Sequence, residues 1–100
     1  MVKSVILTLE ADVERKQILQ YWNERNHSNN YSKKLDKVFR ANFNMLASFP
    51  KMGKSLSIND LRVLVVKDYL FVYREIEEFV EIISIWDSRR DPNKLKTRFK

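Results

Sequence analysis

The sequence predicts an α+β domain with the element order β-α-α-β-β-β, in which a helical hairpin packs on a twisted antiparallel sheet. Two consecutive segments in the first half place apolar residues at helical spacing, and three segments in the second half are rich in β-branched and aromatic residues. One glycine and two prolines leave little room for long irregular loops. A chain of 100 residues holds one hydrophobic core, so we expect one domain over residues 1–92 and a basic C-terminal tail over residues 93–100.

The first two predicted elements are a strand and an amphipathic helix. Residues 2–9 alternate in polarity and include β-branched side chains, which is typical of a strand. The spacing becomes helical over residues 10–25. One face of this helix carries Ala11, Ile18 and Trp22. The polar run over residues 26–30 favours a turn that ends the helix.

A second helix is predicted over residues 31–49, and Pro50 ends it. Its apolar stripe consists of Leu35, Val38, Phe39, Phe43, Leu46 and Phe49. Three members of this stripe should pack on the sheet, namely Phe39, Phe43 and Leu46. Their expected partners on the strands are Leu64, Val72 and Ile83.

The second half of the chain predicts a loop and a three-stranded meander. The loop, residues 51–60, surrounds Gly53, which is the only glycine. Two-residue turns separate strands that are expected at residues 61–66, 69–76 and 79–86. Each strand has apolar residues on both faces, so the helices should cover one face and other structure should shelter part of the second. The tail is expected to form a short helix or a frayed end.

Composition and charge bound the function. The formal charge of +6, from 19 basic and 13 acidic residues, favours an anionic partner such as nucleic acid, an acidic protein or a membrane surface. The absence of cysteine excludes disulfides and fits a reducing compartment. No spacing of histidines and carboxylates indicates a metal site, so we expect neither a metal nor another cofactor. The apolar runs are too short for a signal sequence or a membrane span, which predicts a cytoplasmic protein without membrane contact.

Basic side chains at two places are the candidate binding residues. The last strand should end near Trp86, because Arg89 and Arg90 are rarely buried without partners. Guanidinium groups at a strand exit suit phosphates and carboxylates, and the alternative is a pair of solvated charges. Lys51 and Lys54 flank the glycine, where they could form either an anion-binding rim or a solvated loop.

Six short motifs carry a resemblance to a known family. They are Tyr21–Trp22, Tyr31–Leu35, Phe49–Gly53, Leu61–Arg62, Asp68–Tyr73 and Trp86–Asp91. Together they resemble the RelE/ParE toxin superfamily over residues 7–91. The resemblance implies a toxin of a bacterial type II toxin–antitoxin system, silenced by an acidic cognate antitoxin that is encoded beside it. RelE-like members cut messenger RNA in the ribosomal A site, whereas ParE-like members poison DNA gyrase.

The resemblance also places individual residues. Arg62 and Arg89 stand at two catalytic positions of RelE-like enzymes, while Leu64 and Leu70 replace a lysine and an arginine, and the family tyrosine falls near Leu95. RNA cleavage by a 2′-hydroxyl needs a proton acceptor, cations that stabilise the charged phosphorane, and a proton donor. The two leucines therefore favour a ParE-like toxin that binds a protein target.

Two alternatives stay open from the sequence. Arg62 and Arg89 should lie at opposite ends of the sheet, about 15 Å apart, so that one phosphate cannot contact both. A ribosome-dependent endoribonuclease would then need proton-transfer groups outside the family pattern, with His27, Tyr73 and Lys54 as candidates. The other alternative is a basic binding module without harmful activity.

Overall fold

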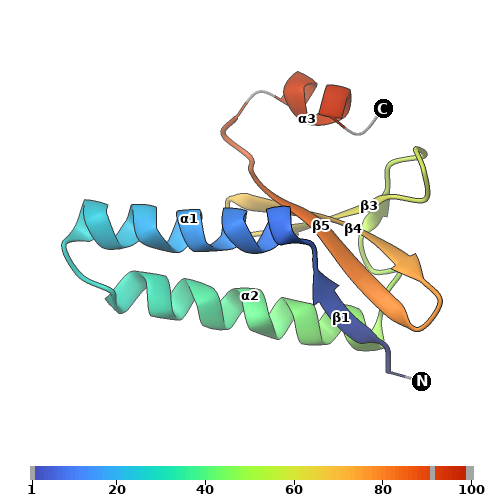
Figure 1. The fold of residues 1–100 in the computed structure, drawn as a ribbon, viewed down its shortest axis with the longest axis horizontal. Helices are drawn as coiled ribbons and strands as arrows, with labels where there is room; N and C mark the ends of the chain where they lie inside the picture. Colours follow the sequence, from blue (N-terminus) through green and yellow to red (C-terminus); the bar gives the residue numbers. More distant parts are fainter. Residues whose placement is uncertain (1, 91, 99–100) are drawn as a thin grey trace.

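The computed structural model describes residues 2–90 and 92–98. The chain forms five strands and three helices in the described residues (Figure 1). In chain order they are β1 (Ser4–Leu7), α1 (Leu9–Asn26), α2 (Asn30–Ser48), β2 (Lys54–Ser55), β3 (Arg62–Val66), β4 (Tyr69–Ile76), β5 (Phe79–Asp87) and α3 (Pro92–Arg98). Helices α1 and α2 form the predicted hairpin, and α3 lies apart from it beyond the end of β5 (Figure 1). The α+β class is therefore confirmed.

The sheet is mixed, whereas the sequence predicted an antiparallel one. Its strand order is β1-β5-β4-β3-β2, and β1 pairs with β5 in parallel while the other pairs are antiparallel. The helical hairpin explains the direction of β1. The Lys3 N–H donates to the Ala47 carbonyl at 2.8 Å, so α2 ends beside the start of β1. The chain then enters the meander at that end of the sheet, which makes β3 and β5 run parallel to β1.

Thr8 ends the first strand earlier than predicted because it caps α1. Its Oγ1 accepts a hydrogen bond from the Ala11 N–H at 3.1 Å, which satisfies a free donor in the first turn of the helix. The same hydroxyl donates to the Ile83 carbonyl at 3.0 Å. The β4–β5 register shifts by one residue there, since Val72 pairs with Ser84 but Tyr73 pairs with Ile82. Thr8 therefore fixes both the start of α1 and the bulge in β5.

The main core lies between the helical hairpin and one face of the sheet. Phe39 is fully buried and makes edge-to-face contacts with Tyr69 and Phe71, with ring centroids 5.5 and 5.3 Å apart. Leu46 belongs to this core, and Phe43 and Leu64 pack at its margin. The predicted hairpin contacts with Leu64 are thus consistent with the structure.

Two of the predicted core partners are wrong, however. Val72 and Ile83 lie in a separate apolar cluster with Trp86, on the other face of the sheet. Side chains alternate across a strand, so an error of one residue in facing moves a side chain to the opposite side. Phe49, expected on the apolar stripe of α2, is instead the C-cap residue and is 63% exposed.

Helix α3 supplies part of the shelter that the second face needs. It spans Pro92–Arg98 and so covers most of the predicted tail, of which residues 99–100 lie outside the described part of the chain. Leu95, near the position of the family tyrosine, is buried in the second apolar cluster. No helix in the described residues is long and apolar enough to cross a membrane.

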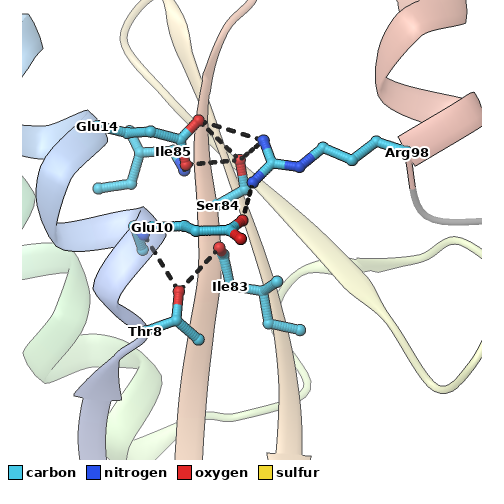
Figure 2. Close-up of polar contacts among 8 residues, drawn as sticks. Thr8, Glu10, Glu14, Ile83, Ser84, Ile85 and Arg98 are labelled. Carbon is cyan, nitrogen blue, oxygen red and sulfur yellow. Dashed lines mark hydrogen bonds and ion pairs between the residues drawn. The ribbon is translucent and has the colours of Figure 1, made fainter.

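A polar network ties α3 to α1 and β5 (Figure 2). The Arg98 guanidinium donates to the Glu14 carboxylate at 3.3 Å and to the Ser84 hydroxyl at 3.2 Å, and it also pairs with Glu10. Ser84 is fully buried and donates in turn to Glu14 at 3.1 Å. Glu14 also accepts from the Ile85 N–H at 3.4 Å, so it occupies the edge of β5 just beyond the strand pairing with β1.

Candidate functional site

The structure separates Arg62, at the start of β3, from Arg89, which follows the end of β5. Arg62 pairs with Tyr73, which pairs with Ile82 near the middle of β5, whereas Asp87 at the end of β5 pairs with Tyr69. The two arginines therefore belong to separate surfaces. One surface is formed by the loop before β3, and the other by the exit of β5.

At the first surface, the Arg62 side chain forms hydrogen bonds with the loop before β3. Its guanidinium donates to the Gly53 carbonyl at 2.8 Å and to the Lys51 carbonyl at 3.4 Å. The hydroxyl of Tyr73 donates to the Pro50 carbonyl at 2.7 Å and accepts from the Gly53 N–H at 2.9 Å. Arg62 and Tyr73 therefore hold the backbone of this loop in place.

Gly53 allows this close approach of loop and strand. A Cβ atom at position 53 would lie 2.6 Å from the Tyr73 hydroxyl oxygen and 2.8 Å from the Val63 carbonyl oxygen. Both distances are too short for a carbon contact, and the Tyr73 side chain is fully buried. The glycine is thus required by the packing of the loop against Tyr73 and Val63.

Lys51 and Lys54 are exposed on this surface. A shallow cavity of about 270 Å³ beside them is lined by Lys51, Arg62, Asp60 and Glu75, together with Ser55. The two carboxylates balance the two cations. This surface is therefore of mixed charge, and Lys54 lies outside the cavity lining.

At the exit of β5, Arg89 is paired within its own turn. Its Nε and Nη2 donate to the two carboxylate oxygens of Asp87 at 3.0 and 2.7 Å, and its backbone N–H donates to the same carboxylate at 2.9 Å. These hydrogen bonds lower the pKa of Asp87 and raise the pKa of Arg89. Arg89 is therefore engaged by Asp87 within its own turn, while its side chain remains 53% exposed.

Arg90 is held in a different way. Its guanidinium carbon lies 4.2 Å from the centroid of the Trp86 ring, which is a cation–π contact. Trp86 is 4% exposed and belongs to the second apolar cluster, so the ring is a fixed platform. Among the described residues, no carboxylate forms an ion pair with Arg90. Within that part of the chain, the contact of the Arg90 guanidinium is therefore with the Trp86 ring.

A groove of about 420 Å³ connects this strand exit with helix α1. We call it the strand-exit groove, and its lining includes Gln17, Ile18, Tyr21, Tyr69, Ile85 and Arg90. Glu14, Asp87 and Arg89 also border it. The sequence indicated the arginines but missed the wall from α1. The only signal was the placement of Gln17 and Tyr21 one helical turn apart, next to the apolar face.

His27, a catalytic candidate, caps a helix, and the two leucines at family cation positions pack against apolar clusters. His27 is the C-cap of α1 with a φ of 50°, and its backbone N–H donates to the Asn23 carbonyl. Leu64 packs at the margin of the hairpin-side core, and Leu70 packs at the margin of the cluster on the opposite face. Within the described residues, no group of three or more histidines and carboxylates could hold a metal ion.

Comparison with solved structures finds the same fold in another protein. A solved structure described as a chromosomal ParDE toxin–antitoxin system from P. aeruginosa matches with a TM-score of 0.73 at 13% sequence identity, covering 86% of this chain and 96% of that chain. At this identity the likeness shows a shared fold. No match was found among curated proteins.

A match of the sequence to a family model identifies the family, independently of that structure. The family model of the ParE toxin of the type II toxin–antitoxin system parDE matches residues 5–92. The chain belongs to the ParE toxin family of type II toxin–antitoxin systems. The RelE/ParE resemblance is confirmed on its ParE side, and membership implies an antitoxin as partner.

Proposed function

We propose that the protein inhibits growth by binding and poisoning a protein target such as DNA gyrase, that it acts in the cytoplasm, and that an acidic cognate antitoxin encoded beside it neutralises it. The observation that carries the proposal is the lack of an assembled cationic cluster in the described residues. Cleavage of RNA needs several cations around one phosphate, together with groups that move protons.

The individual side chains support this argument. Arg62 donates hydrogen bonds to the loop carbonyls of residues 51 and 53, and Arg89 donates to the Asp87 carboxylate. Leu64 and Leu70 lie on opposite faces of the sheet, so cations at these positions would not converge on one site. The Tyr73 hydroxyl is engaged with the loop backbone, and burial raises its pKa, which disfavours loss of its proton, and so its action as a base, near neutral pH.

Induction of the chain alone should stop growth and switch on a DNA-damage reporter, because a poisoned gyrase leaves broken DNA. Co-expression of the neighbouring acidic reading frame should restore growth, and the two products should co-purify. A frameshifted copy of the toxin gene is the control for the burden of expression. Normal growth after induction of the folded chain, with no binding of the neighbouring product, would contradict the proposal.

A further inference from the structure

Helix α3 follows the part of the chain that the family model matches. The match ends at residue 92, and α3 spans Pro92–Arg98. The helix has seven residues and lies apart from the helical hairpin, beyond the end of β5 (Figure 1). A helix of this length is not stable by itself in water, so α3 keeps its form through contacts with the rest of the domain.

One of these contacts is apolar. Leu95 is 8% exposed and belongs to the second apolar cluster, together with Leu61, Val72 and Trp86. This cluster lies on the face of the sheet that the hairpin does not cover, so α3 supplies its cover through Leu95. Burial of the leucine side chain stabilises the docked position of the helix.

Another contact is polar, and we call it the Arg98 latch. It consists of the Arg98 guanidinium with Glu10, Glu14 and Ser84 (Figure 2). The side chains of Arg98 and Glu10 are 29% and 72% exposed, so dissolved salt can screen their attraction. Glu14 also accepts from the Ser84 hydroxyl at 3.1 Å and from the Ile85 N–H at 3.4 Å, and neither hydrogen bond involves α3. The latch can therefore open without leaving the buried Ser84 hydroxyl or the Glu14 carboxylate unpaired.

The packing beside Leu95 includes an unfavourable feature at Trp86. Its indole N–H is buried, and no group in the described part of the chain accepts a hydrogen bond from it. A buried donor without an acceptor destabilises a protein by about as much as burial of one leucine side chain stabilises it. Trp22 provides the contrast, because its indole N–H donates to the Tyr69 hydroxyl at 2.8 Å. Water that reaches the Trp86 N–H would therefore offset part of the cost of exposing Leu95.

We propose that α3 is a latched lid: it leaves the second apolar cluster as a unit and returns to it in the free protein, and Arg98 controls how much of the protein has the lid closed. The closed lid conceals the cluster, and the open lid admits water to Trp86. Opening is a local event that leaves the sheet and the hairpin-side core folded. The closed form spares the free toxin a larger exposed apolar surface. This inference concerns the chain by itself and is independent of the target proposed above.

Hydrogen exchange followed by NMR tests the lid, because the two tryptophan indole N–H groups lie in different places. Trp86 is in the cluster under α3, whereas Trp22 packs against the hairpin-side core. Arg98→Gln removes the charge of the latch, and Leu95→Ala removes the apolar anchor. Lys37→Gln is the matched control, since it removes one positive charge from an exposed position on α2. Each full-length protein is measured at about 0.1 M and about 1 M salt, between which the screening length falls from about 10 to about 3 Å.

In the unmodified protein, the Trp86 indole N–H and the α3 amides should exchange at least about a hundredfold faster than the Trp22 indole N–H. Their exchange should also depend much less on added urea, because opening of the lid exposes little surface. Arg98→Gln and Leu95→Ala should each speed Trp86 exchange at least about tenfold, as expected for loss of a charged hydrogen bond or of a buried leucine side chain. High salt should speed Trp86 exchange in the unmodified protein and in Lys37→Gln but not in Arg98→Gln.

The proposal is overturned if the two indole N–H groups exchange at the same rate with the same dependence on urea, because α3 then leaves only when the whole domain unfolds. It is also overturned if Trp86 exchanges no faster in Arg98→Gln than in Lys37→Gln. If a variant does not fold, the salt series on the unmodified protein still decides. Exchange at Trp86 that is equal at low and high salt would show that Arg98 is no latch.

Discussion

Replacing Phe39 with alanine is expected to lower the free energy of unfolding by about 3–5 kcal/mol. The side chain is fully buried between the helical hairpin and the sheet. Its ring contacts Tyr69 and Phe71 edge-to-face, so the substitution leaves a cavity and removes both aromatic pairs. A loss of this size is a large part of the stability of a domain of 100 residues.

Urea denaturation followed by tryptophan fluorescence measures this change. Phe49→Ala is the matched control, because it removes the same side chain from a position that is 63% exposed. The control should change the free energy of unfolding by less than about 0.5 kcal/mol. Equal effects of the two substitutions, or a loss below about 1 kcal/mol for Phe39→Ala, would contradict the described facing of α2.

Replacing Tyr73 with phenylalanine should cost about 1–3 kcal/mol, because the change leaves the Pro50 carbonyl and the Gly53 N–H without their partner. The ring itself stays in the core, so the loss of stability measures the two hydrogen bonds between the Tyr73 hydroxyl and the loop backbone. Hydrogen exchange at the Gly53 amide should accelerate together with the loss of stability. Tyr31→Phe, at an exposed position on α2, is the control and should leave both quantities unchanged.

The same hydroxyl predicts a dependence on alkaline pH. Burial raises the pKa of Tyr73, so the folded state favours the neutral phenol more than the unfolded state does. The corresponding stability is present below the ordinary tyrosine pKa of about 10 and is lost as the pH rises through the raised pKa. Tyr73→Phe should therefore show a smaller loss of stability at alkaline pH than the unmodified protein.

Local chemistry made the meander predictable from the sequence. Strand β4 has the predicted bounds, Tyr69–Ile76, because two-residue turns stand on either side of it. Lys67 and Glu77 in these turns adopt φ values of 56° and 51°, which tight hairpin turns require. Strand facing was not predictable in the same way. The strands are apolar on both faces, so the alternation that identifies a strand does not tell which side meets the helices.

Contacts between distant segments set the features that the sequence missed. The parallel pairing of β1 follows from the contact between Lys3 and Ala47, and β2 is a strand of two polar residues that has no apolar pattern. At the site, the positions of Arg62 and Arg89 were predicted but their partners were not. Arg62 meets a loop nine residues away in the sequence, whereas the Asp87–Arg89 pair is local and could have been anticipated from its spacing.

We propose that this ParE-family toxin acts on a protein and does not cleave RNA. The most direct test is to map RNA 5′ ends across the transcriptome shortly after induction, with uninduced cells and a frameshifted copy as references. With Leu64 and Leu70 in place of cations, and with Arg62 and Arg89 already bound within the chain, we predict no new ends in register with codons. Codon-phased ends that depend on the intact toxin would contradict the account and establish a ribosome-dependent endoribonuclease.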